Sequence, residues 1–458
     1  MRILHYALGF PPFRRGGMTK YCIDIMSEQL KCGHKVAMLW PGRIKKYGYE
    51  TKINQTKSQK INGELVCESY EIINPLPVPL LNGIKDVEAF TQEKDESAFY
   101  NFLKKKEIEV IHIHTLMGLP RECIVAAQKL NIKLIYTTHD YFGICPKWGL
   151  IYKGKICDSD DDCKKCVECN KTALSLNKIK FLQSHVYKNV KDLKIISSLR
   201  KRHNKNLYEE SNENKEEMPH ITEDIIKTSE DYKTLREYYI SMLEEMDVIH
   251  FNSSNTEKIF NRYFSTNKNG RVISITHGSI SDNKKVREYD KKLRLGYLGP
   301  ITEHKGFFAL KKVCDELYKE NKEIFQLNIF SDYDGNEEYI IKHDPYKYEE
   351  LSQVRDSIDI LVVPSLWNET FGFTVLEALS YGVPVITSKY VGAKDLLING
   401  KTGLIYENLE ELKSILENII INPKTKLGQM NNYIIESVNI NDINKHTKQI
   451  EKLYFNLI

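Results

Sequence analysis

The chain has 458 residues, with 66 Lys and Arg against 62 Asp and Glu and a formal net charge of +4. At about 150 residues per domain this length predicts two or three domains. A composition with 28% charged and 10% aromatic residues excludes collagen-like and wholly disordered proteins. The charge excess is too small to indicate nucleic acid as a partner, and we expect none.

No apolar run approaches the roughly 18 residues that a membrane-spanning helix needs. Residues 1–6 are followed by Gly9 and the Pro11-Pro12 pair, so the start of the chain lacks the apolar core of a secretory signal. We therefore expect a cytoplasmic protein, in which cysteine thiols stay reduced.

The first forty residues are expected to form a strand, a turn-rich glycine loop, a helix and a second strand. Residues 2–6 and 36–40 are short apolar runs, and residues 18–30 place apolar side chains at helical spacing before Gly33 ends the helix. A strand–helix–strand unit of this kind is typical of a parallel sheet. Further strands of the same sheet are expected at residues 110–114, 133–137 and 247–252.

A second unit of the same kind is expected after the polar stretch 281–292. Parallel strands that are buried on both faces read as continuous apolar runs, and such runs lie at residues 293–298, 325–330, 358–363 and 383–387. The expected fold class is therefore α/β, with two helix-covered parallel sheets facing each other across a cleft. Ligands are expected beyond the carboxyl ends of the strands. Residues 143–246 fit neither sheet and are interpreted as an insertion in the first domain.

The most informative segment contains two glutamates eight positions apart, Glu369 and Glu377. It is expected to hold a strand end, a turn at Phe371-Gly372 and a helix that begins near Phe373. Backbone N–H groups at such a helix start can bind a diphosphate, and a carboxylate in the turn can accept hydrogen bonds from sugar hydroxyls. Two glutamates alone would indicate only a solvated surface pair, but the apolar strand and the glycine turn favour a functional site.

This segment resembles the Glu-x7-Glu signature of family 4 glycosyltransferases, which have the GT-B fold of two Rossmann-like domains. The resemblance continues through residues 378–387 and ends with Gly392 and the run 400–404. It implies transfer of a sugar from a nucleotide-diphosphate sugar to a glycan or lipid-linked acceptor, with retention at the anomeric carbon and no metal requirement for transfer. A role in cell-surface polysaccharide or glycoconjugate biosynthesis is the expected setting.

The same resemblance implies the division of the chain into domains. Residues 1–280 would form the acceptor-binding domain, and residues 281–438 the domain for the nucleotide sugar. Residues 439–458 would form a helix that returns to the first domain.

Two loops carry the resemblance outside the glutamate segment. Gly16 and Gly17 precede the first helix, where the family has a Gly-Gly loop near the donor phosphate, and glycine lets a backbone approach phosphate closely. Lys305 and Gly306 match the end of the family's Gly-Arg-x4-Lys-Gly loop, whose cations hold the leaving diphosphate. Pro300 stands where the family has arginine, so one of the two charges is missing.

Histidines follow two of the predicted strands. His139 comes after strand 133–137, where the resemblance places a donor-sugar contact, whereas His114 at the end of strand 110–114 is more often a structural residue. The implied catalytic residues are His139, Lys305 and Glu369. The implied donor-binding residues are Gly16, Gly17, Phe371, Gly372, Phe373, Thr374 and Glu377.

A cysteine cluster is the second strong feature of the sequence. Five cysteines lie within 25 residues and include two overlapping C-x2-C spacings. Adjacent C-x2-C thiolates suit a tetrahedral zinc ion, so four of the five are expected to hold structural zinc, with a redox or Fe–S role less favoured. A subset of the resembled family has a similar cluster. The candidates are Cys145, Cys157, Cys163, Cys166 and Cys169.

Residues 171–205 carry ten Lys and Arg against one acid, Asp192, with apolar residues at helical spacing. A basic amphipathic helix is typical of peripheral contact with an anionic membrane. A helix packed on the domain by its apolar face is an equally favoured alternative. The membrane interpretation would place the protein at the inner face of the membrane and favour a lipid-linked acceptor.

Two other functions stay open. A catalytically silent relative could act as a binding or chaperone subunit of an active partner, and Pro300 leaves room for this. A nucleotide-sugar epimerase on the same fold is the second. A dehydrogenase is the least favoured, because no G-x-G-x-x-G run follows the first strand.

Overall fold

The computed structural model describes residues 1–45, 50–63, 65–79, 83–159, 161–184, 187, 223–265, 269–289, 292–320 and 324–455. The chain divides into two compact units, each with its own sheet and core. Unit 1 comprises Met1–Phe251, Glu257–Arg271 and Thr447–Ile458, and unit 2 comprises Asn252–Thr256 and Val272–His446.

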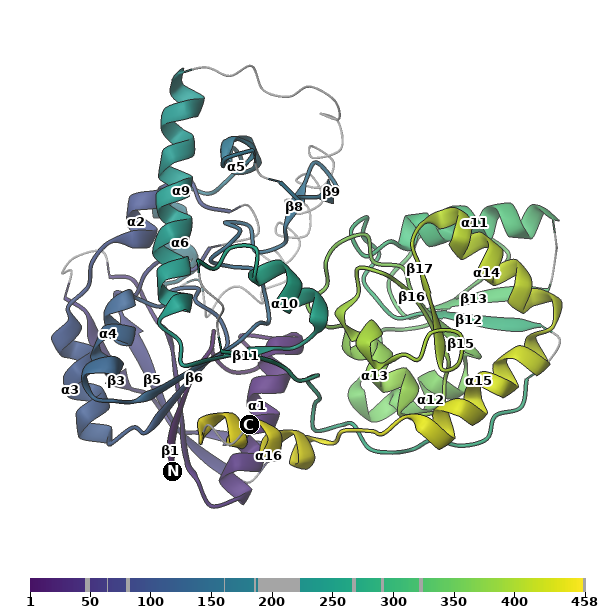
Figure 1. Cartoon of the computed structure of the whole chain (residues 1–458), viewed down its shortest axis with the longest axis horizontal. Helices are drawn as coiled ribbons and strands as arrows, with labels where there is room; N and C mark the ends of the chain where they lie inside the picture. Colours follow the sequence, from purple (N-terminus) through teal and green to yellow (C-terminus); the bar gives the residue numbers. More distant parts are fainter. Residues whose placement is uncertain are drawn as a thin grey trace. The chain divides into compact units, whose positions relative to one another are not determined.

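Unit 1 is built on a sheet with the order β11-β10-β7-β6-β1-β2-β5-β3, and β4 also pairs with β5 (Figure 1). The central neighbours from β10 through β7, β6, β1 and β2 to β5 are parallel, whereas β3 and β4 are antiparallel to β5. The five strands predicted for this unit are confirmed. The strands are β1 (Arg2–Tyr6), β2 (Lys35–Pro41), β3 (Lys52–Gln55), β4 (Gln59–Ile61), β5 (Leu65–Ile73), β6 (Val110–Ile113), β7 (Lys133–Thr137), β10 (Val248–Phe251) and β11 (Gly270–Val272).

The helices of this part of the chain begin with α1, which confirms the predicted first helix. They are α1 (Gly17–Lys31), α2 (Val87–Thr91), α3 (Glu96–Lys106), α4 (Arg121–Lys129), α5 (Lys164–Cys169), α6 (Leu176–Leu182), α9 (Glu223–Glu244), α10 (Ser254–Phe260) and α16 (Ile443–Tyr454).

The segment interpreted as an insertion contains a small hairpin, β8 (Ile151–Tyr152) with β9 (Lys155–Ile156), and the helices α5, α6 and α9. Helix α9 packs against α5 and α2. Tyr232, Leu235 and Tyr239 are buried, and their spacing of three and four residues puts them on one face of the helix. Of the basic segment 171–205, residues 185–186 and 188–205 lie outside the described residues.

Unit 2 has a six-stranded sheet with the order β14-β13-β12-β15-β16-β17, parallel throughout. Its four predicted strands are confirmed, and Figure 1 shows α11 and α14 on one side of the sheet and α12 and α13 on the other. The strands are β12 (Leu293–Tyr297), β13 (Phe325–Ile329), β14 (Ile340–Lys342), β15 (Ile360–Val363), β16 (Val385–Ser388) and β17 (Gly403–Tyr406). The helices are α11 (Phe307–Glu320), α12 (Leu351–Asp356), α13 (Phe373–Leu379), α14 (Leu409–Ile421) and α15 (Pro423–Ser437), with short 3-10 turns at Tyr348–Glu350 and Gly392–Leu396.

Among the helices of the described ranges, none is long and apolar enough to cross a membrane.

Candidate functional site

Lys305 and Glu369 form an ion pair in unit 2, between the loop after β12 and the loop after β15. The Lys305 Nζ lies 2.5 Å from Glu369 Oε1, and the Ser365 hydroxyl donates to the same oxygen at 2.5 Å. The Lys305 ammonium also lies 5.0 Å from the centre of the Trp367 ring. Burial alone would raise the pKa of Glu369, but the Lys305 charge and these hydrogen bonds outweigh it and lower the pKa. The carboxylate is therefore held ionised and in one orientation.

Two glycines fix the backbone around this pair. Gly306 has φ +76°, and a Cβ there would lie 1.7 Å from the carbonyl oxygen of Pro364, so only glycine lets the Lys305 loop reach the end of β15. Gly372 has φ +109° and caps α13. A Cβ on Gly372 would lie 3.0 Å from Glu369 Oε2. Because α13 begins at Phe373, the turn and helix start that the sequence predicts are confirmed.

The remaining donor-site candidates flank this cap. Phe371 is buried just before it, and Phe373 and Thr374 are the first two residues of α13. The structure therefore brings Lys305 and Glu369 together with the predicted glycine turn.

Glu377 is a buried carboxylate whose two oxygens both have partners. Its Oε1 lies 3.2 Å from His277 Nε2, and its Oε2 accepts from Arg355 Nη2 at 2.6 Å. Burial would raise the pKa of Glu377, but the His277 hydrogen bond and the Arg355 charge lower it overall. The rings of Tyr348 and Phe373 pack on His277 with centroids 5.0 and 5.1 Å away.

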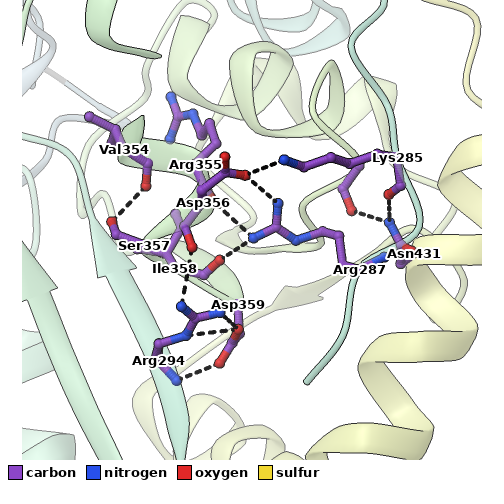
Figure 2. A network of polar contacts seen from close by, with 11 residues as sticks. Lys285, Arg287, Arg294, Val354, Arg355, Asp356, Ser357, Ile358, Asp359 and Asn431 are labelled. Carbon is purple, nitrogen blue, oxygen red and sulfur yellow. Dashed lines mark hydrogen bonds and ion pairs between the residues drawn. The ribbon is translucent and has the colours of Figure 1, made fainter. Parts of the chain in front are cut away.

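Arg355 is itself held by a polar network at the end of α12 (Figure 2). The Arg287 Nη2 donates to the carbonyl oxygens of Arg355 and Ile358, at 2.7 Å each. The Asp356 carboxylate lies 3.6 Å from Arg287 Nη1 and 2.8 Å from Lys285 Nζ. Arg287 thus fixes the backbone from which Arg355 extends to Glu377.

The other candidates lie in unit 1. Gly16 has φ +111° and caps α1, with open space where a Cβ would be, and Gly17 is the first residue of that helix. His139 lies two residues after the end of β7, and its Nε2 lies 3.3 Å from Nδ1 of the fully buried His114. His139 is thus attached to the polar core of unit 1.

The five clustered cysteines share one region of unit 1. Cys163 caps α5, and Cys166 and Cys169 lie within it. A hydrogen bond with Cys163 and burial raise the pKa of the Cys166 thiol, and Arg236 Nη2 lies 3.8 Å from its sulfur. Within the described ranges, three candidate ligand atoms come within 4.8 Å of one another only at His5, Cys22 and His114. The zinc assignment stays a prediction.

Several partners of the candidate residues were not expected from the sequence. Ser365 contacts Glu369 from the same loop after β15. His277 and Arg355, the partners of Glu377, are 100 and 22 positions away from it in the sequence. No spacing rule connects residues so far apart. The signal that could have identified Arg355 is an arginine next to an apolar strand, where a buried charge needs a partner.

Acidification is expected to destabilise unit 1 from about pH 6.5 downward. Burial lowers the pKa of His5 to about 4, against about 6.5 in an unfolded chain. Below about pH 6.5 the unfolded chain therefore binds a proton at His5 that the folded unit does not, which favours unfolding. Asp140 works in the opposite direction, because burial raises the pKa of its carboxyl to about 6. Amide hydrogen exchange of β1 and β6 across this pH range measures the effect.

The control for that measurement is a histidine outside unit 1. His5→Asn should reduce the pH slope of β1 and β6 protection without abolishing it, because burial also lowers the pKa of His114 and His139. His304→Asn should leave the slope unchanged. A wild-type slope that is flat or that rises on acidification would contradict the expectation.

Comparison with known proteins connects this geometry to a family. Residues 279–437, which contain Lys305, Glu369 and Glu377, match the model of "Glycosyl transferases group 1". A capsular polysaccharide biosynthesis glycosyltransferase, CapM of Staphylococcus aureus, is 28% identical over 211 residues, covering 39% of this chain and 53% of that protein. The matches span between 15% and 53% of the length of the curated relatives.

Solved structures extend the likeness to the whole chain at the level of fold. A sucrose-phosphate synthase from Thermosynechococcus elongatus superposes with a TM-score of 0.57 at 15% identity, covering 100% of this chain and 98% of that one. The Anabaena protein HepE in complex with UDP gives a TM-score of 0.56 at 12% identity, with full coverage of both chains. The fold that the chain shares with these solved structures is that of two Rossmann-like domains. Residues 279–437 of this chain are thus similar to the group 1 glycosyl transferases.

Proposed function

We propose that the protein transfers a sugar from a nucleotide-diphosphate sugar to a glycan or lipid-linked acceptor, with retention of the anomeric configuration. The observation that carries the proposal is the Lys305–Glu369 pair beside the Gly372 turn, inside the segment that matches the family. An ammonium held at a glycine turn suits a diphosphate, and a fixed carboxylate beside it suits sugar hydroxyls.

The proposed mechanism follows from the bond that breaks. Cleavage of the anomeric C–O bond develops positive charge on the sugar and negative charge on the departing diphosphate. Lys305 would stabilise that negative charge, and the diphosphate would compete with Glu369 for the ammonium. His139 and Glu369 would orient the sugar, and Glu377 the ribose. We assign no enzymic nucleophile.

The nature of the substrates rests on the relatives. HepE is described in complex with UDP and with UDP-glucose, and CapM as a capsular polysaccharide biosynthesis enzyme. By analogy we propose a nucleotide-diphosphate sugar as donor and a role in cell-surface glycan synthesis, with UDP as the first nucleotide to try.

A thermal-shift panel of UDP, GDP, ADP and CMP tests the donor site. A nucleotide at 100 times its dissociation constant should stabilise the wild type by about 2.7 kcal/mol. Glu377→Ala should lose this response because the ribose contact is removed. One diphosphate that stabilises the wild type but not the variant would identify the base.

The competing function is a catalytically silent binding subunit, which the proline at position 300 favours because it removes a phosphate-binding charge. No shift with any nucleotide, in a protein that is folded, would favour this function over the transferase.

We also propose a structural zinc held by four of Cys145, Cys157, Cys163, Cys166 and Cys169, and contact of residues 171–205 with anionic membranes at the inner face. The cysteine spacing and the basic segment support these proposals. Metal analysis of the purified protein tests the first, and binding to anionic vesicles tests the second.

A further inference from the structure

A chain of buried polar side chains crosses the core of unit 1. It contains Gln29 of α1, His5 of β1 and His114 after β6, each 0% exposed, and Tyr454 of α16 at 5%. Buried polar groups that all have partners stiffen a core and hold one arrangement. This series of hydrogen-bonded side chains ends at His139, the proposed sugar contact.

The spacing of His5 and His114 fits a hydrogen bond between the two rings better than a shared metal ion. His5, Cys22 and His114 place their candidate ligand atoms within 4.8 Å of one another. His5 Nδ1 and His114 Nε2 are, however, only 2.9 Å apart, which is a hydrogen-bond distance. Two nitrogens at about 2.0–2.1 Å from one zinc ion would stand roughly 3.3 Å apart in tetrahedral geometry.

The side-chain amide of Gln29 determines which atom donates and which accepts in each of these hydrogen bonds. Its Nε2 donates to the Tyr454 oxygen at 2.9 Å, and its Oε1 lies 2.7 Å from His5 Nε2. An amide oxygen can only accept, so His5 must carry its proton on Nε2. A neutral imidazole has one N–H, which leaves His5 Nδ1 as an acceptor.

The same constraint passes from His5 to His139. Since His5 Nδ1 accepts, His114 must donate to it from Nε2, at 2.9 Å. His114 Nδ1 is then an acceptor, and it takes the Nε2 proton of His139 at 3.3 Å. Burial lowers the pKa of His5 and His114 far enough that both rings are neutral near pH 7.

We propose that Gln29 is a positioning residue that fixes His139 as its Nε2–H tautomer, acting through His5 and His114. The Nε2 proton of His139 is committed to His114, so Nδ1 is the nitrogen that accepts. Any sugar hydroxyl that His139 binds through its ring is bound as a donor to Nδ1. The role of His139 with a sugar rests on the proposed function, whereas its tautomer does not.

The test is the histidine tautomer in protein labelled with 15N at histidine, read from long-range proton–nitrogen correlations near pH 7. We expect His5, His114 and His139 all to be Nε2–H in the wild type. A wild-type His139 that is Nδ1–H or doubly protonated would overturn the proposal, whatever the variants do.

Three variants separate positioning from general loss of stability. Gln29→Met removes the acceptor and should let His139 populate both tautomers. Gln29→Glu keeps an acceptor oxygen and should restore the single Nε2–H form. Tyr239→Phe is the matched control, because it removes a buried hydroxyl that donates to the Phe90 carbonyl oxygen and takes part in none of the hydrogen bonds from Gln29 to His139. An unchanged His139 tautomer in Gln29→Met would refute the proposal.

Activity gives a separate readout. In Gln29→Met, kcat should fall roughly 2- to 10-fold, because only part of the population keeps the productive tautomer. The nucleotide-induced thermal shift should stay at the wild-type value. If the protein transfers no sugar, the tautomer result still stands and the proposed function alone fails.

Discussion

Arg355→Met is expected to lower the free energy of unfolding of unit 2 by about 3–5 kcal/mol, because it leaves the buried Glu377 carboxylate without its countercharge. Arg355 is 0% exposed and Glu377 2%, and their charged atoms are 2.6 Å apart. The pKa of Glu377 should rise, since burial would then act against the His277 hydrogen bond alone. Hydrogen exchange of the α13 and β15 amides measures the loss locally.

The matched control is Lys285→Met in the same network (Figure 2). The Lys285–Asp356 pair is at 2.8 Å with side chains about half exposed, so its removal should cost no more than about 1 kcal/mol. If Arg355→Met costs no more than Lys285→Met, the buried pair is not the support that its geometry indicates.

A double variant separates stability from ligand binding. Arg355→Met combined with Glu377→Leu removes both charges, and buried ion pairs can often be replaced by apolar residues at little cost. We expect most of the lost stability to return. The nucleotide-induced thermal shift should be absent, as expected for Glu377→Ala. Recovery of that shift would show that Glu377 does not contact the nucleotide.

Lys305→Ala is expected to lower kcat/KM about 10²- to 10³-fold, the usual cost of removing one group that stabilises developing negative charge. The nucleotide-induced thermal shift should vanish with it. The variant also leaves Glu369 buried without its ammonium, so the pKa of that carboxyl should rise. Release of nucleoside diphosphate from the donor identified by the panel is the assay.

Lys311→Ala is the control for this variant, because Lys311 lies in α11 and pairs with Asp315 and Glu337, away from Glu369. It should keep both turnover and the thermal shift. The proposed role of Lys305 would fail if the two variants behaved alike. Glu369→Gln then tests the other half of the pair, since it removes the charge and keeps the shape.

Five strands of the first sheet and four of the second were predictable, because burial on two faces leaves continuous apolar runs. The run Val110 to Ile113 shows this clearly, and it forms β6 in the middle of its sheet. Strand β3 was missed because Lys52–Gln55 is short, lies at the edge of the sheet and contains a single apolar residue. Helix α9 was missed because its own sequence is rich in charged residues, which interrupt the apolar pattern.

The site was predictable only where its residues are close in sequence. The Gly372 turn and α13 follow from local rules, and Glu369 and Glu377 lie within that segment. The pairing of Lys305 with Glu369 spans 64 positions, and that of His112 with Tyr454 spans 342. Such contacts depend on how strands are ordered in the sheet, and periodicity carries no information about that order.

The bond between Gln29 and Tyr454 joins residues 425 positions apart, with all of unit 2 encoded between them. During synthesis, α1 and β1 leave the ribosome early, and their buried polar groups have no partner from α16 until the second unit has been made. The core of unit 1 can be completed only after the chain for unit 2 exists. Ribosome-bound chains that stop short of Tyr454 would therefore carry a first unit with its histidine network still open to water.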